Sequence, residues 1–226
     1  MKHTLFAFVA LFLLSCENKK VLQLPEISHS EITNLTDVSH AYLFYNETQP
    51  DSVELNRKNL ISTTNWLINV DKRLTLKQAI PHIKFLQDKK KSSSHKNENA
   101  KNYFTCHDLS RNNLGFLEFS DIAYEDYGFN HILENTKERN WTPIIVHVES
   151  ADKIFFLFIA KDESPKTNTL NLKNDIENIL KRSTGMLKII LSINKNISFQ
   201  DYISIKTQLS ELKIENLEIL EQERIY

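Results

Sequence analysis

The sequence predicts an α+β fold made of two small mixed sheets, each with helices on one face. Apolar segments rich in β-branched and aromatic residues, which are typical of strands, alternate with segments whose apolar residues recur at helical spacing. One strand–turn–helix segment also occurs twice, at residues 68–77 and 191–200. Because helices that cover a sheet bury both apolar patterns, we expect two related halves packed side by side.

The repeated segment keeps a constant offset of 123 residues, the difference between positions 191 and 68. Nearly every aligned pair keeps its chemical type, and the offset also aligns Ile80 with Ile203 and Leu86 with Leu209. Both copies therefore predict a strand, a polar turn and a capped helix with the same buried stripe. A chance similarity of two strand–helix units is the alternative.

The predicted first half covers residues 39–127. Its strands are expected at residues 41–45, 103–107 and 114–119, with a strand or a hairpin at residues 60–70. Thr75 and Gln78 form a capping box, after which apolar residues recur at helical spacing from Leu76 to Leu86. Pro81 lies inside that pattern, and an interior proline removes a helical hydrogen bond, so we expect a kink or a late helix start there.

A polar connector at residues 128–142 leads to the predicted second half, residues 143–226. The order expected there is strand, strand, helix, strand, helix, strand, with strands at residues 144–148, 153–160, 187–193 and 217–220. Gly185 stands where a helix C-cap belongs, and Ser198 with Asp201 forms a second capping box.

The amino terminus has the organisation of an export signal. A lysine at position 2 precedes an apolar run from Leu5 to Leu14, which is shorter than the roughly 20 residues that a membrane-spanning helix needs. The run ends in Leu13, Leu14, Ser15 and Cys16, which resembles the lipobox of bacterial lipoproteins. The resemblance implies that residues 1–15 are removed and that Cys16 carries acyl chains. An ordinary helix with a buried cysteine is the alternative.

We interpret residues 16–38 as a polar tether between this anchor and the folded body, because the segment contains Pro25 and shows no sustained apolar period. The anchor implies a membrane partner and a place in the cell envelope. The outer membrane, with the protein facing the periplasm, is favoured over the inner membrane.

Composition excludes several functions. With 28 basic and 29 acidic residues, the net charge of −1 provides no electrostatic surface for nucleic acid. Only three glycines occur, at Gly115, Gly128 and Gly185, so the glycine-rich loops that hold nucleotide phosphates are missing and no cofactor is expected.

The residues able to carry chemistry form no recognisable site. Cys106 lies in a strand-like segment and is interpreted as a buried free thiol, and His147 as a surface or hydrogen-bonded histidine. The histidines lack metal-ligand spacing, so we expect neither a metal site nor a catalytic site. Asp121, Glu125 and Asp126 fit a solvated acidic loop. The alternative is an envelope hydrolase that uses carboxylates near Glu125 and Asp126.

Residues 143–221 resemble the periplasmic domain of the ExbD/TolR family of biopolymer-transport proteins. The resemblance rests on the order of elements, on the stretch 188–202 and on the hairpin at residues 145–158 with its turn at Asp152. It implies a non-enzymatic binding or adaptor role toward an envelope transport protein or peptidoglycan, and we consider a homodimer as well. Family members carry a transmembrane helix with an aspartate, whereas the apolar segment here has no acidic residue.

Overall fold

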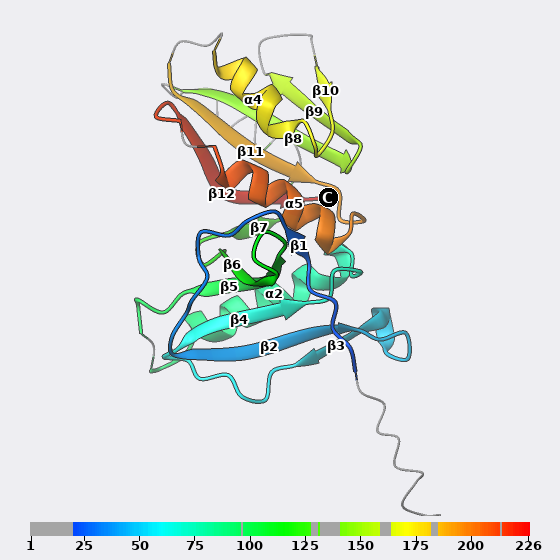
Figure 1. Cartoon of the computed structure of the whole chain (residues 1–226), viewed down its shortest axis with the longest axis vertical. Helices are drawn as coiled ribbons and strands as arrows, with labels where there is room; N and C mark the ends of the chain where they lie inside the picture. Colours follow the sequence, from blue (N-terminus) through cyan, green and yellow to red (C-terminus); the bar gives the residue numbers. More distant parts are fainter. Residues whose placement is uncertain are drawn as a thin grey trace, which may run out of the picture.

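The computed structural model of the chain describes residues 20–95, 97–127, 131, 141–158, 164–181, 185–212 and 214–226. Within these residues the protein is an α+β structure with three α-helices and two mixed sheets of six strands each (Figure 1). The predicted α+β class with two mixed sheets is therefore confirmed, whereas the ExbD/TolR-like order of the second half is not. None of the helices in these ranges has the length and apolar character required to cross a membrane.

The first sheet combines parallel and antiparallel neighbours. Its main path runs in the order β1 (Glu26–Ile27), β5 (Asn102–Asp108), β4 (Asn65–Val70), β2 (Val38–Tyr45) and β3 (Val53–Asn56), and β6 (Asn113–Glu118) pairs with β5. The short 3-10 helix η1 (Pro50–Ser52) leads into β3, and α2 (Leu76–Lys91) connects β4 to β5. Strands β2, β4, β5 and β1 are parallel to one another, as the long α2 crossover requires.

The second sheet runs in the order β10 (Lys166–Thr167), β9 (Lys153–Phe158), β8 (Thr142–Ser150), β11 (Leu187–Ile193), β12 (Leu217–Ile225) and β7 (Ala123–Glu125). Helix α4 (Leu172–Leu180) precedes β11, and α5 (Phe199–Ser210) connects β11 to β12. The chain order from residue 142 is therefore the hairpin β8–β9, then β10, α4, β11, α5 and β12. The sequence pattern did not predict β10, which has only two residues.

The helices of each half cover one face of its sheet. Alternate strand residues such as Ala41 and Leu43 on β2, or Val146 and Val148 on β8, belong to one large buried cluster together with residues of all three helices. On the opposite faces lie two small clusters, one around Leu67 and one around Ile145. Because the large cluster includes residues from both sheets, the two halves share one core.

The prediction that residues 16–38 form a tether is wrong for part of the segment that the structure describes. Strand β1 lies within it and pairs in parallel with β5, so that Glu26 stands beside His107. Ile27 and Ser30 are buried, and Ile32 pairs with Phe116 through an isolated bridge. Two residues are too short to show a strand period, and only pairing with a distant strand places them in the sheet.

The predicted boundary at residue 127 also differs from the structure. Strand β7 precedes that boundary but pairs in parallel with β12, with Tyr124 beside Glu223, and so belongs to the second sheet. Residues 1–15, Cys16 and most of the predicted connector lie outside the described residues. Thr142, assigned to the connector, already belongs to β8.

Both predicted helix caps are present. The Thr75 side chain accepts a hydrogen bond from the Gln78 backbone and the Gln78 side chain accepts one from the Thr75 backbone, which is the predicted capping box. Ser198 caps α5 by accepting from the backbone of Asp201, but the Asp201 side chain accepts from the Ser198 hydroxyl instead of its backbone, so only half of the second capping box is formed. The expected late helix start at Pro81 is not found, because α2 begins at Leu76 and continues through the proline.

The two copies of the repeated segment face each other across a local two-fold axis. Thr75 and Ser198, which are 123 residues apart, form an antiparallel bridge between the starts of α2 and α5. Two pairs of backbone hydrogen bonds accompany this bridge, and the offset of 123 residues relates the two bonds of each pair. In the first pair, Leu76 donates to Ile197 (3.1 Å) and Phe199 donates to Leu74 (2.6 Å). In the second pair, Lys77 donates to Lys195 (2.7 Å) and Gln200 donates to Lys72 (3.3 Å). The repeat seen in the sequence is therefore also a structural repeat.

Candidate functional site

A pocket of about 240 Å³ lies where the first turns of α2 meet β7 and the end of β12. We call it the seam pocket, because residues of both halves line it. Leu76, Ile80, Pro81 and Ile225 supply apolar surface. Charged side chains of both signs border the same space, from Lys77, Lys84, Lys195, Glu125 and Asp126.

Side chains of α2 hold β7 at this position. Lys84 donates from Nζ to the carbonyl oxygen of Tyr124 at 2.8 Å, and Gln87 donates from Nε2 to the carbonyl oxygen of Ile122 at 2.9 Å. A helix of the first half thus fixes an edge strand of the second sheet. The pocket exists only because these two distant segments are joined.

The structure separates the three acidic residues singled out in the sequence. Glu125 and Asp126 line the seam pocket, whereas Asp121 lines a different pocket and lies 3.9 Å from Lys101 Nζ. Asp126 is exposed and Glu125 is partly buried. Hydrolysis by paired carboxyl groups requires both groups to flank one bound substrate. The arrangement brings two of the three together, beside lysines.

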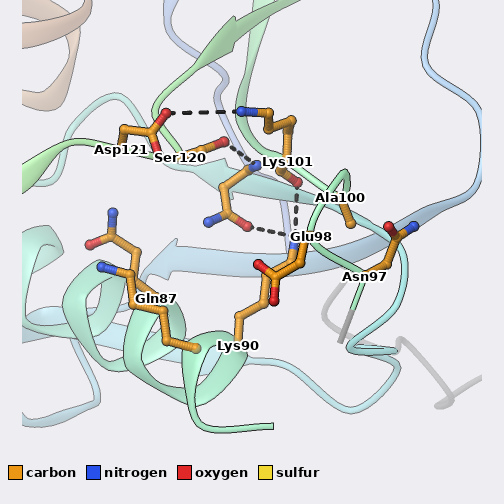
Figure 2. A pocket seen from close by; sticks show the side chains of 10 residues that line it. Gln87, Lys90, Asn97, Glu98, Ala100, Lys101, Ser120 and Asp121 are labelled. Carbon is orange, nitrogen blue, oxygen red and sulfur yellow. Dashed lines mark hydrogen bonds and ion pairs between the residues drawn. The ribbon is translucent and has the colours of Figure 1, made fainter. Parts of the chain in front are cut away.

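The second pocket, of about 160 Å³, lies between the end of α2 and the start of β5. In Figure 2, Gln87 and Lys90 of the helix stand across the pocket from Lys101, Ser120 and Asp121. Lys90 is buried, and its Nζ donates to the carbonyl oxygen of Lys101 and to Oδ1 of Asn102, both at 3.0 Å. Nζ also lies 5.4 Å from the centre of the Trp66 ring.

Burial lowers the pKa of Lys90 from 10.5 to about 8. A buried amine with a lowered pKa is one mark of a functional site. Here, however, the ammonium group holds the carboxyl end of α2 against the first residues of β5, so we assign Lys90 a structural role.

Lys90 should make stability depend on pH. Below about pH 8 the amine is protonated in both the folded and the unfolded protein. Between about pH 8 and 10.5 it is protonated only in the unfolded chain, which therefore binds one more proton than the folded protein. The free energy of unfolding should therefore rise with pH in that window. We expect urea midpoints to increase from pH 7.5 to 9.5. The Lys90→Met variant should lose this increase, and an equal increase in both proteins would contradict the assignment.

Cys106 is fully buried, as predicted, and burial raises the pKa of its thiol to about 12. The thiol therefore stays protonated at neutral pH and is a poor nucleophile. Among the described residues, no three histidine, cysteine or carboxylate side chains lie close enough together to hold a metal ion.

His147 is hydrogen-bonded, as predicted. Its Nδ1 lies 3.3 Å from Oγ of Ser192, its Nε2 lies 3.1 Å from the hydroxyl of Tyr226, and its ring stacks on that of Tyr226. Desolvation lowers the pKa of His147, which favours the neutral ring. The sequence pattern did not indicate this serine–histidine contact, whose members are 45 residues apart. Ser192 is fully buried and also accepts from Arg224, which argues for a structural role.

No protein-family model, curated protein or solved structure matches this chain. The resemblance of residues 143–221 to the ExbD/TolR domain therefore rests on the sequence pattern described above.

The seam pocket is the best candidate for a ligand site among the described residues. In the second pocket the buried amine already donates to two oxygens of the protein, and in the serine–histidine pair Ser192 is fully buried and already hydrogen-bonded to Arg224. The seam pocket instead presents apolar surface together with the exposed side chains of Lys77, Lys195 and Asp126. Such a mixture suits binding better than it suits acid–base chemistry.

Proposed function

We propose that this chain is a lipid-anchored cell-envelope protein with a non-enzymatic binding or adaptor role. The observation that carries the proposal is the motif Leu13–Leu14–Ser15–Cys16 at the end of an apolar run of signal-peptide length. Lipid on Cys16 holds the mature protein on the membrane surface, because each buried methylene contributes about 0.8 kcal/mol and several acyl chains add together.

The binding role is supported by the resemblance of the second half to the periplasmic domain of ExbD and TolR proteins. The partner is then an envelope transport protein or peptidoglycan, and the chain acts as an accessory to a transport or envelope-integrity system. The seam pocket offers this partner apolar contact and charges of both signs. The proposed location is the outer membrane, facing the periplasm.

The test is lipidation and fractionation of the Cys16→Ala variant in bacterial cells. The wild-type protein should incorporate labelled palmitate and sediment with membranes, and the variant should incorporate none. Ser15→Ala, which keeps a small residue before the cysteine, is the matched control and should behave as the wild type. Absence of label in the wild-type protein, or equal labelling of the Cys16→Ala variant, would refute the proposal.

A further inference from the structure

Three aromatic rings form a ladder on the outer face of β2. His40, Tyr42 and Phe44 are alternate residues, and their rings stack with centres 6.0 Å and 5.9 Å apart. The intervening Ala41 and Leu43 point into the core, so the ladder faces away from it. His40 is exposed, and Tyr42 and Phe44 are partly exposed.

The described chain begins beside this ladder. Lys20 forms an ion pair with Glu54 on the edge strand β3, and Glu54 is the register partner of Phe44. The next residue, Val21, is 70% exposed. In Figure 1 the blue segment that starts at residue 20 runs past the end of β3, far from α4 and β10 of the second half.

The chain between the anchor and this corner is short. Lys20 follows Cys16 by four residues, which span at most about 14 Å when fully extended. The polar layer on each side of a bilayer is roughly 5–8 Å thick. If the acyl chains of Cys16 lie in the hydrocarbon core, the corner formed by Lys20, Glu54 and Phe44 is therefore within reach of the lipid headgroups.

We infer that the outer face of β2 rests against the headgroup layer of the membrane that holds the anchor. This inference rests on the proposed lipidation of Cys16. Tyrosine and other amphipathic rings favour the membrane interface, where an apolar ring and a polar tip are both accommodated. Tethering turns a contact that is weak between separate molecules into an intramolecular one, which raises its occupancy.

This orientation has a consequence for the seam pocket. Strands β2 and β3 lie at one end of the molecule and the second sheet at the other, as Figure 1 shows. With this end of the molecule on the lipid, the second sheet projects away from the membrane. The seam pocket between the halves then lies above the lipid surface, where a soluble or cell-wall partner can reach it.

The experiment measures tryptophan quenching by brominated phospholipids in vesicles that carry the lipidated protein. In the Tyr42→Trp variant, most of the added tryptophan emission should be lost relative to vesicles of unbrominated lipid. The matched control is Leu170→Trp, because Leu170 is 85% exposed and belongs to the second half. Its added emission should stay unchanged. Phe44→Trp, nearest to Lys20, provides a second probe should Tyr42→Trp fold poorly.

Flotation of the vesicles distinguishes a wrong orientation from a missing lipid anchor. If the lipidated protein floats with the vesicles but the probes at positions 42 and 44 are quenched no more than the probe at position 170, the orientation is refuted while the proposed anchoring stands. If the protein isolated from membranes carries no lipid and does not float, the proposed function fails, and this inference fails with it.

Discussion

Replacing Phe104 with alanine is expected to destabilise both halves of the molecule by about 3–5 kcal/mol. Phe104 lies on β5 of the first sheet and is 1% exposed. Its ring stacks on that of Phe119, with the ring centres 3.8 Å apart. It also makes edge-to-face contacts with Phe199 and Tyr202 of α5 in the second half, with ring centres 5.2 and 6.4 Å away. The cavity left by the substitution would therefore open at the contact between the halves.

Native-state hydrogen exchange measures this effect in each half separately. In the Phe104→Ala variant, the slowest amides of β4 and of β11 should lose protection by the same amount, because one core serves both sheets. Phe85→Ala is the control, since Phe85 is 44% exposed on α2 and should lose less than about 1 kcal/mol. Loss of protection confined to β4 would show that the halves unfold independently.

Replacing Lys206 with methionine should cost about 3–5 kcal/mol, because it leaves a buried carboxylate without its cation. Glu223 on β12 is completely buried, and its side chain forms an ion pair with Lys206 of α5. It also accepts a hydrogen bond from the hydroxyl of Tyr202 at 2.8 Å. The same low-dielectric surroundings raise the pKa of Tyr202 and of Tyr124 well above 10, mainly through desolvation.

A second substitution distinguishes the lost charge pair from lost packing. The double variant Lys206→Met with Glu223→Gln removes the unpaired charge but keeps an acceptor for Tyr202, so it should recover most of the lost stability. Urea unfolding followed by circular dichroism gives the three free energies. A double variant no more stable than Lys206→Met would show that packing of the lysine stem, and not the buried charge, causes the effect.

Much of the candidate site was beyond prediction from the sequence. The acidic residues near position 125 were recognised, but the pocket beside them also needs Leu76 and Lys84 of α2, and Lys195 and Ile225 of the second half. No local pattern connects these positions. The burial of Cys106 was predicted correctly, because its apolar strand neighbours already indicate it, and His147 is hydrogen-bonded as expected.

The sequence by itself determined the α+β class, the strand–helix repeat and both helix caps. Each depends on residues close together in the chain: side chains three or four apart along a helix, alternate residues of a strand, or a cap and the residue three positions later. Only the tertiary structure decided that β1 and β7 are strands, that β7 belongs to the second sheet and that the repeats meet at Thr75 and Ser198. Two- and three-residue strands carry no periodic signal, because their stability comes from backbone bonds to distant partners.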